Sequence, residues 1–191
     1  MNYAPLDPTQ TVVLFADLQI GIVDFAATND AHRLRSAVAA LAKLARLFDI
    51  PTVVTTAPGQ AGPPLVMPEL TAVIGNLPLH TRNTTDSFLH PPTRAAIEET
   101  GRKTLLIAGV ATEIIVQHSA LSGAAHGFHV HVVIDACGGL STRTEEAAFR
   151  RLTQAGIVST SIASIAGQLA GDFTKPKGGQ AIGILYEMAT P

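Results

Sequence analysis

The hydrophobic positions of this chain follow two alternating patterns. Short runs such as residues 11–17 are apolar and rich in β-branched residues, which predicts strands covered on both faces. Longer segments place apolar residues every three or four positions. Within residues 31–48, Leu34 and Val38 follow that spacing, while the Arg and Lys side chains lie mostly elsewhere, which predicts an amphipathic helix.

This alternation predicts six strands and five helices. The expected strands occupy residues 11–17, 52–56, 76–81, 103–108, 128–134 and 157–160. The expected helices occupy residues 31–48, 94–100, 112–127, 144–156 and 162–169, and residues 57–64, with two Gly and three Pro, are expected to form a loop. Alternating strands and helices imply right-handed crossovers, so we expect a three-layer α/β/α fold with a six-stranded parallel sheet.

The last segment of the chain differs in character from the rest. Residues 175–179 resemble a flexible linker, and residues 181–186 are apolar again. We therefore expect one domain over residues 1–172 and a C-terminal arm over residues 173–191. The arm is expected to dock on its own domain or on a neighbouring subunit.

Composition narrows the classes of partner. Hydrophobic residues make up 47% of the chain and charged residues 15%, so part of the surface is expected to be covered by another copy, in a dimer or a larger ring. The formal net charge is -2 and no basic stripe is present, which argues against nucleic acid. We therefore expect the chain to bind a small-molecule ligand.

The cellular compartment is also suggested by the sequence. Cys137 is the single cysteine, so no intramolecular disulfide forms, and residues 1–11 lack the features of a secretory signal. No apolar run reaches the roughly 20 residues needed to cross a bilayer. We expect a cytoplasmic protein with no membrane span.

Polar residues that follow the predicted strands are the candidates for chemistry, because open parallel sheets bind ligands at the carboxyl ends of their strands. These candidates are Asp17, Gln19, Arg82, residues 109–112 and residues 135–138. An Asp at a strand end more often caps a turn than catalyses. The set of residues therefore has to be judged together.

Three of these segments resemble, in order and spacing, the motifs of isochorismatase-like cysteine hydrolases. They are Phe15-Ala-Asp-Leu-Gln19, an Arg six residues before Phe88, and Gly109-Val-Ala-Thr-Glu-Ile-Ile-Val116. Residues 101–113 and Val133-Ile-Asp-Ala-Cys-Gly138 look particularly like the YcaC-related branch of that family. The resemblance covers most of residues 10–170.

The resemblance implies a catalytic group of Asp, Lys and Cys, which correspond here to Asp17, Arg82 and Ile115. It also implies a cis peptide bond between Val110 and Ala111, and an oxyanion hole formed by the amides of Ala111 and Ile115. The further residues that we expect around a substrate are Gln19, Phe25, Phe88, Thr112 and Glu113.

Two of the three catalytic positions differ from the family pattern. Arg82 keeps a cation beside Asp17, which we expect to lower the pKa of the carboxyl, although a guanidinium cannot lose its proton. Ile115 can neither attack a carbonyl carbon nor be activated by a base, so covalent chemistry at this position is excluded.

Other nucleophiles and metals are weaker candidates. Cys137 lies near Asp135, whose charge disfavours the thiolate, so we interpret Cys137 as structural. His129 and His131 alternate along one strand, but no third ligand has matching spacing, and no metal or cofactor is expected.

Two functions remain open. In the first, Asp17 acts as a general acid in non-covalent hydrolysis, as in the isochorismatases, while Arg82 binds an anionic substrate and Gln19 orients it. In the second, the chain is a catalytically silent homologue that binds a small molecule or serves as a scaffold. A third interpretation, an unrelated doubly wound protein, predicts that Asp17 lies far from Arg82.

Overall fold

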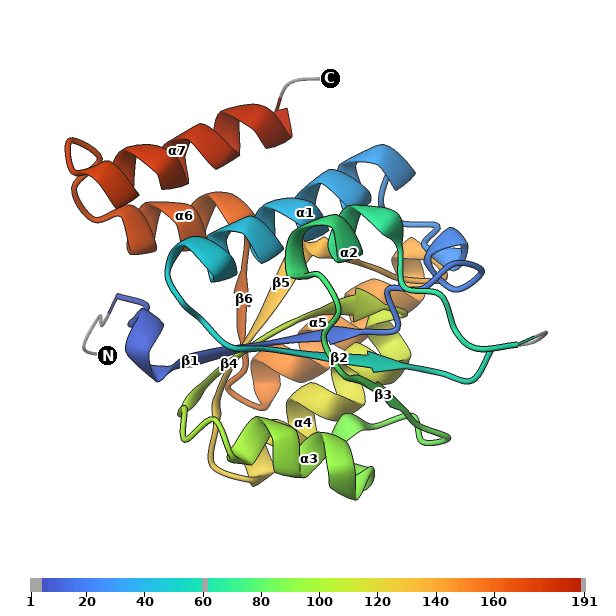
Figure 1. The fold of residues 1–191 in the computed structure, drawn as a ribbon. Helices are drawn as coiled ribbons and strands as arrows, with labels where there is room; N and C mark the ends of the chain where they lie inside the picture. The colour runs from blue at the N-terminus through green and yellow to red at the C-terminus, as the bar shows by residue number, and fades with distance from the viewer. Residues whose placement is uncertain (1–4, 60–61, 190–191) are drawn as a thin grey trace.

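Six parallel strands form the centre of the molecule, in the order β3-β2-β1-β4-β5-β6 (Figure 1). The computed structural model describes residues 5–59 and 62–189. The strands are β1 Thr11–Ala16, β2 Thr52–Thr56, β3 Leu79–Thr81, β4 Thr104–Val110, β5 His129–Gly138 and β6 Val158–Thr160. The expected six-stranded parallel sheet is confirmed.

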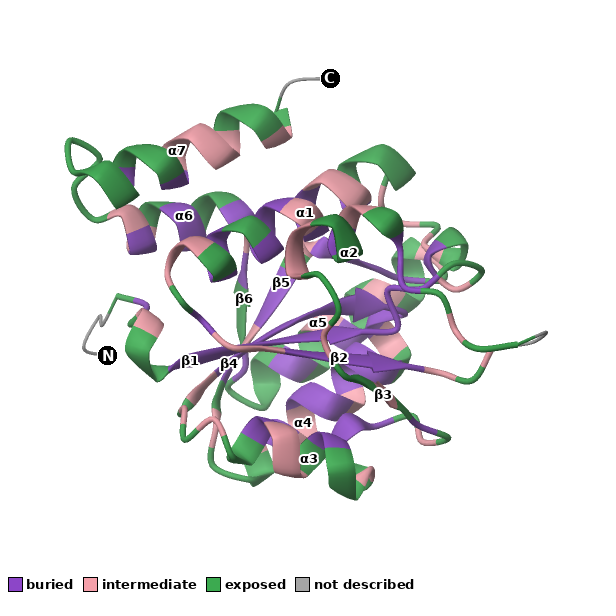
Figure 2. Cartoon of the chain, viewed as in Figure 1, coloured by how far each residue is buried: buried purple, intermediate pink, exposed green. Residues whose placement is uncertain are grey.

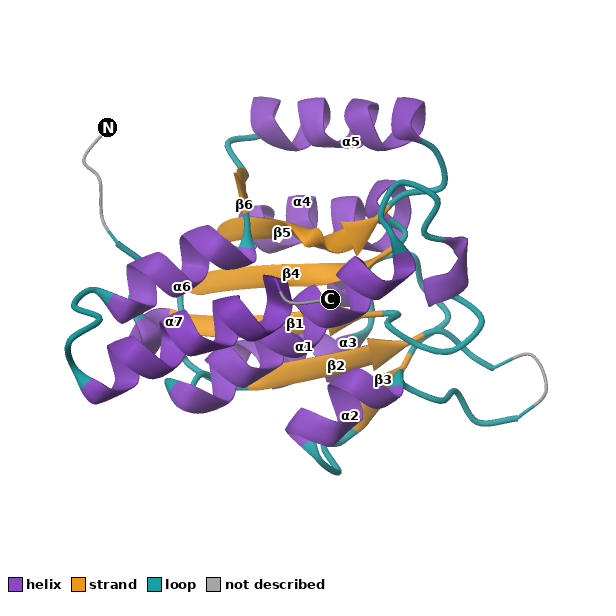
Figure 3. Ribbon diagram, turned by 90° about the horizontal axis from the view of Figure 1, so that it is seen from above, coloured by secondary structure: helices purple, strands orange, loops and turns teal. Residues whose placement is uncertain are grey.

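Helices cover both faces of this sheet (Figures 1 and 3). The helices are α1 Ala31–Leu47, α2 Pro68–Ile74, α3 Pro91–Glu98, α4 Gln117–Ala125, α5 Thr142–Gln154, α6 Ile162–Ala170 and α7 Pro176–Ala189. One layer holds α1, α2, α6 and α7, and the other holds α3, α4 and α5. A π-helical turn, Thr112–Val116, connects β4 to α4, and single 3-10 turns span Pro8–Gln10, Val23–Phe25 and Ser87–Leu89.

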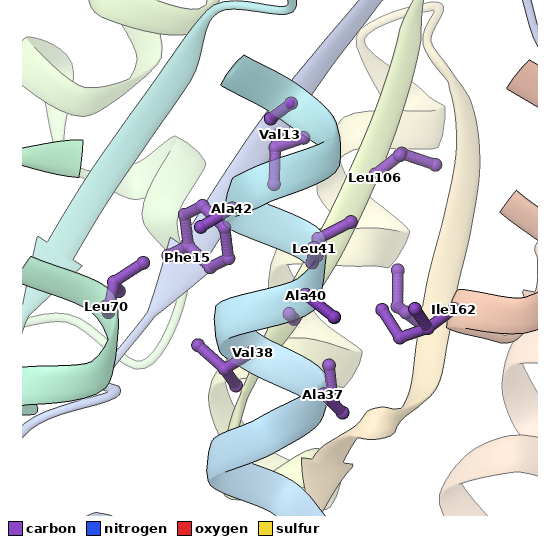
Figure 4. Close-up of a cluster of buried hydrophobic side chains, with 14 of the residues drawn as sticks. Val13, Phe15, Ala37, Val38, Ala40, Leu41, Ala42, Leu70, Leu106 and Ile162 are labelled. Carbon is purple, nitrogen blue, oxygen red and sulfur yellow. The ribbon is translucent and has the colours of Figure 1, made fainter. Parts of the chain in front are cut away.

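Two hydrophobic cores result from the alternation of side chains along the strands. Val13 and Phe15 face the α1 layer, where they pack with Leu41 (Figure 4). Val12 and Leu14 face the α4 layer instead. Every residue of β1 is therefore buried, and the outward faces of the helices carry the exposed positions (Figure 2).

Glycine is required where β1 and β4 approach each other most closely. A Cβ at Gly109 would lie 2.3 Å from the carbonyl oxygen of Ala16, which is far inside contact distance. The two strands pair directly at this point, Ala16 with Gly109. The close approach brings the carboxyl ends of β1 and β4 together, which positions the segments that follow each strand.

Three segments differ from the sequence expectations. The strand expected to end before Asp135 continues to Gly138, because its pairing with β4 shifts register between Ile107 and Gly109 and so accommodates extra residues. The expected helix over 112–127 is divided into the π-helical turn and α4. The strand expected over 76–81 forms only at Leu79–Thr81, and α2 was not predicted.

The expectation of a flexible linker at residues 175–179 is wrong, because α7 begins at Pro176. A proline suits the first turn of a helix, where its missing N–H has no intrahelical partner. The helix then packs on α1 and α6 of its own domain and buries Ala181. Ion pairs from Lys177 to Asp49 and from Glu187 to Lys43 flank this contact.

Two further expectations concern loops and membranes. Residues 57–59 and 62–64 are neither helix nor strand, as expected, and the remaining two residues of that loop lie outside the described residues. Among the helices of the described ranges, none is both long enough and apolar enough to cross a bilayer.

Candidate active site

A cavity of about 330 Å³ opens at the carboxyl ends of β1, β3 and β4. The strand order reverses direction between β1 and β4, and doubly wound sheets bind their ligands at such a point. The cavity is lined by Asp17, Ala57, Pro58, Arg82, Asn83, Thr84, Thr85, Ile114 and Ile115. The structure therefore brings together the three positions that the resemblance placed in the catalytic group.

Asp17 is the first residue after β1. Its amide donates a hydrogen bond to the carbonyl of Thr55 at 3.0 Å, so the chain is still held against β2 at this point. Its φ angle of 55° lies in the left-handed region, which non-glycine residues seldom occupy. Asp49, at the end of α1, has a φ of 57°, so this backbone angle does not by itself identify a site.

Arg82 follows β3 and reaches Asp17 across β2. Its amide donates to the carbonyl of Thr56 at 3.0 Å, and its Nη2 donates to Oδ2 of Asp17 at 2.5 Å. Its Nη1 donates to the carbonyl of Thr84. The side chains of Arg82 and Asp17 are only 3% and 9% exposed, so the ion pair is almost fully removed from water.

Each residue of this ion pair has one polar side-chain atom that makes no hydrogen bond to the described residues. Oδ1 of Asp17 and Nε of Arg82 are buried and have no hydrogen-bond partner among the described residues. Buried polar groups in folded proteins are nearly always paired, with protein or with a bound molecule. Both residues line the cavity, but these two atoms are themselves buried, so a bound molecule reaches them only if the side chains shift.

Burial raises the pKa of the Asp17 carboxyl above its ordinary value, and the opposing charge of Arg82 does not fully offset this effect. The expectation of a lowered pKa is therefore wrong. Sequence reasoning counted the neighbouring cation but not the loss of water around the carboxyl. A raised pKa makes Asp17 a stronger proton acceptor than an ordinary aspartate.

Ile115 lies in the π-helical turn, is 1% exposed and packs in the hydrophobic core of the α4 layer, and it is also among the residues that line the cavity. The peptide bond between Val110 and Ala111 is cis, as the resemblance implies. Position 115 therefore holds a buried hydrocarbon side chain at a cavity that Asp17 and Arg82 also line.

Two expected substrate-binding residues point elsewhere and fix this turn. Thr112 Oγ1 donates to Glu145 of α5 at 2.6 Å. Glu113 Oε1 accepts from the amide of Leu140 at 2.9 Å and from Thr144 Oγ1 at 2.6 Å. Neither Thr112 nor Glu113 is among the residues that line the cavity.

The other three expected binding residues also lie off the cavity surface. Gln19 exchanges two hydrogen bonds with the backbone of Ala57, at 2.9 and 3.1 Å, and so positions one wall of the cavity. Phe25 is 58% exposed in its 3-10 turn, whereas Phe88 is 2% exposed and stacks edge-on against Phe128. Gln19 thus supports the site indirectly.

Sequence reasoning missed six lining residues, namely Ala57, Pro58, Asn83, Thr84, Thr85 and Ile114. The signal was present, because Pro58 follows β2 and residues 83–85 follow Arg82 at the end of β3. A strand-end rule applied to the four residues that follow each strand finds all six.

Neither Cys137 nor the histidine pair of β5 lines this cavity. Cys137 is buried in β5, where burial raises the pKa of its thiol. His129 and His131 lie at the amino end of β5, far along the strand from the cavity. Within residues 5–59 and 62–189, no group of three His, Cys, Asp or Glu side chains is placed to hold a metal ion.

Known proteins resemble this chain over most of its length. Residues 11–164 match the Isochorismatase domain family. The probable hydrolase YcaC of Escherichia coli is 36% identical over 157 residues, which cover 81% of this chain and 74% of that protein.

Two solved structures share the fold closely. YcaC from Pseudomonas aeruginosa, with hexane-2,5-diol and covalent acrylamide, is 31% identical with a TM-score of 0.90, covering 99% of this chain and 96% of the other. The E. coli YcaC gene product, described as an octameric hydrolase of unknown specificity, is 32% identical with a TM-score of 0.87, covering 98% and 90%. At this coverage both matches include α7.

The buried ion pair predicts a pH-dependent stability in Arg82→Met. Removing the cation leaves Asp17 buried and unpaired, so the variant is expected to lose about 3–5 kcal/mol of stability near neutral pH. Without Arg82 the folded-state pKa of Asp17 rises further above its unfolded value of about 3.9, so the folded state binds the extra proton. Stability is then greatest at acid pH and falls as the pH rises through the folded-state pKa.

Thermal melting of Arg82→Met between pH 4 and pH 8 measures this decrease of stability with rising pH. Adding Asp17→Asn to Arg82→Met should remove it, because no carboxyl remains to titrate. Arg35→Met is the matched control, since Arg35 forms half-exposed pairs with Asp24 and Glu69 that contribute roughly 1 kcal/mol or less. A melting temperature of Arg82→Met that does not fall with rising pH would contradict the assignment.

Proposed function

This chain belongs to the isochorismatase family, in the branch related to YcaC, and we propose that it is a hydrolase whose proton transfers run through Asp17 without a covalent intermediate. The observation that carries the proposal is the buried Asp17–Arg82 pair at the wall of a cavity in which Ile115 occupies the expected nucleophile position. No thiol lines this cavity among the described residues.

The proposed reaction uses water as the nucleophile. Asp17 accepts a proton from the water as the water oxygen bonds to the electrophilic carbon of the substrate. The bond between that carbon and the leaving group then breaks, and Asp17 returns the proton to the leaving atom. The raised pKa supports both steps, because a carboxyl titrating closer to neutral pH both accepts and donates a proton more readily.

Arg82 and the backbone assist these steps. Arg82 keeps the carboxyl oriented through its contact with Oδ2, while Oδ1 has no hydrogen-bond partner among the described residues. The amides of Ala111 and Ile115, which the resemblance assigns to an oxyanion hole, are proposed to stabilise the negative oxygen that forms during attack. This scheme differs from the sequence hypothesis in starting from an ionised Asp17 and not from a protonated one.

A second candidate function is favoured by Ile115 itself. A hydrocarbon at the nucleophile position makes the cavity wall apolar and suits binding better than covalent chemistry. In this alternative the chain is a catalytically silent, ligand-binding oligomer. The variants Asp17→Asn and Ile115→Cys distinguish the hydrolase from the silent binding protein.

Asp17→Asn tests the hydrolase. The native protein is expected to hydrolyse at least one member of a panel of small esters, amides and vinyl ethers, and the variant should lose about 10²–10⁴-fold in kcat/KM because it has no proton acceptor. Asp24→Asn is the matched control, since Asp24 is an exposed carboxylate outside the cavity. Native turnover that survives in Asp17→Asn would contradict the mechanism, and absence of native turnover on the whole panel would favour the silent alternative.

Ile115→Cys tests the nucleophile position. In the native protein, acrylamide should not label Cys137, because the thiol is buried and its pKa is raised. In the variant, the sulfur of residue 115 should bond to the terminal alkene carbon while the neighbouring carbon takes up a proton. Peptide mass spectrometry locates the adduct.

Ile107→Cys is the matched control for this labelling, because Ile107 is equally buried in β4 but does not line the cavity. It should stay unlabelled. Hydrolysis gained only in Ile115→Cys would identify a silenced cysteine hydrolase, whereas a folded Ile115→Cys that resists acrylamide would remove position 115 from the accessible site.

We also propose that the chain forms a homo-oligomer in which the 173–191 segment contributes to the contact. The octameric E. coli YcaC and the 70% exposed side chain of Phe173 support this proposal. Sedimentation velocity should give a mass that is a multiple of the 19.9 kDa chain. A single species at the mass of one chain, at micromolar concentration, would overturn it.

A further inference from the structure

A second cavity, of about 500 Å³, lies at the amino ends of β4, β5 and β6, at the opposite edge of the sheet from the cavity that Asp17 lines. We call it the amino-end cavity. Its lining includes residues 5–7 of the N-terminal segment, Lys103 and Thr104 at the start of β4, and His129 and His131 of β5. The two cavities share no lining residue, so they are separate sites.

Backbone pairing fixes the positions of the two histidines. Thr104 of β4 pairs with His129, and His131 pairs with Val158 of β6. Alternate residues of a strand face the same side of the sheet, so His129 and His131 share one face. Val130, which lies between them, packs in the core of the α4 layer, so both histidines face the side that α1 covers.

The N-terminal segment crosses the same face of the sheet. Leu6 packs in the core of the α1 layer, and its amide donates a hydrogen bond to the side chain of Gln168 in α6 at 3.0 Å. At the other end of the segment, the carbonyl of Gln10 accepts from the amide of Lys103 at 2.9 Å. These contacts hold the segment in place, so the segment and the histidine face form two walls of one cavity.

Three side chains at this cavity can carry positive charge. Lys103 is charged at neutral pH, and His129 and His131 become charged as the pH falls. His129 is exposed and His131 is half-buried, and within the described ranges none of the three side chains forms a hydrogen bond or an ion pair. Burial, and then the nearby His129, lowers the pKa of the His131 imidazole. An anion between the two rings would offset both effects.

A single carboxylate opposes these charges. Asp7 is the one Asp or Glu among the described residues that line the cavity. Its Oδ1 accepts from the amide and the hydroxyl of Thr9, at 2.8 and 2.7 Å, which lowers the pKa of the carboxyl, and the charge of Arg102 lowers it further. β6 and α6 contain no Asp, Glu, Lys, Arg or His. With both histidines protonated, positive charge therefore exceeds negative charge around the cavity.

We propose that the amino-end cavity binds a small oxyanion of the phosphate class between His129, His131 and Lys103. A tetrahedral oxyanion has several acceptor oxygens, and the cavity offers it imidazole N–H groups, an ammonium group and the hydroxyl of Thr104. A metal ion fits less well, because no group of three His, Cys, Asp or Glu side chains is placed to hold one within residues 5–59 and 62–189. The proposal does not depend on the function of the Asp17 site.

Binding is expected to be strongest at acid pH. An oxyanion stabilises the protonated imidazoles, so the complex takes up protons that the free protein lacks at neutral pH. The affinity is therefore greatest below the pKa of the histidines in the free protein, and it falls as the pH rises toward their higher pKa in the complex. Sulfate is the probe for this dependence, because it keeps two negative charges throughout the range in which phosphate changes its own charge.

Equilibrium dialysis with radiolabelled sulfate or phosphate, at fixed ionic strength, measures the binding. Both ions are expected to bind the native protein saturably at pH 5.5, and the affinity for sulfate should fall at least about tenfold between pH 5.5 and pH 8. The double variant His129→Asn/His131→Asn should lose most of the binding at pH 5.5, together with the pH dependence. Failure of either ion to saturate at pH 5.5, or an affinity for sulfate that rises with pH, overturns the proposal.

His80→Asn is the matched control for the histidine variant. His80 also lies near another histidine, His90, and burial also lowers its pKa, but it belongs to β3 and does not line the amino-end cavity. Sulfate binding should be unchanged in His80→Asn. A loss of binding in His80→Asn as large as that in the double variant would contradict the proposed location.

Two single variants test the charge balance independently of the histidines. Asp7→Asn removes the opposing charge and keeps a side-chain oxygen for Thr9, so it should tighten sulfate binding, whereas Lys103→Met should weaken it. Circular dichroism checks that each variant is folded, and if the double histidine variant fails to fold, these two variants still decide. A folded Asp7→Asn that binds sulfate no more tightly than the native protein contradicts the proposal.

Discussion

The buried ion pair between Asp17 and Arg82 is the interaction on which the site depends. Its partners are 65 residues apart and come from the ends of β1 and β3, so it forms only when the strands pair in the observed order. Removing both charges from water is costly, and the pair is held by backbone contacts of Asp17 to Thr55 and of Arg82 to Thr56. The raised pKa of Asp17 follows from the burial that this arrangement imposes.

Hydrophobic spacing predicted the elements that are long and covered by the core. Residues 11–17 and 31–48 were located to within one residue at each end, because β1 is buried throughout and α1 presents one apolar face. The elements that were missed or misplaced have weaker patterns. The short helix α2 buries only Leu70, and α7 contains adjacent glycines at 178 and 179, which have a low intrinsic helix propensity.

The sequence brought together three residues that line one cavity, but it did not predict the burial and hydrogen bonds around them. The resemblance brought Asp17, Arg82 and Ile115 together, and the structure places all three around one cavity. Sequence alone gave the wrong direction for the pKa of Asp17, since depth of burial is a property of the packed fold. It also placed Thr112 and Glu113 at the substrate, whereas their hydrogen bonds to Glu145 and Thr144 anchor the π-helical turn on α5.

Arg82 and Ile115, which replace the Lys and Cys of the family pattern, reduce the number of side chains at the site that can exchange protons. A group of Asp, Lys and Cys contains three side chains that can exchange protons, whereas Arg keeps its proton at all accessible pH values and Ile has none to exchange. In this chain Asp17 is therefore the one cavity-lining side chain, among those described, that titrates near neutral pH or below. Since no thiol has to be deprotonated, its carboxylate is free to act on water or to accept a hydrogen bond from a ligand. Hydrolysis and silent binding therefore use the same cavity, and they differ in whether a water reaches the Asp17 carboxyl beside the bound molecule.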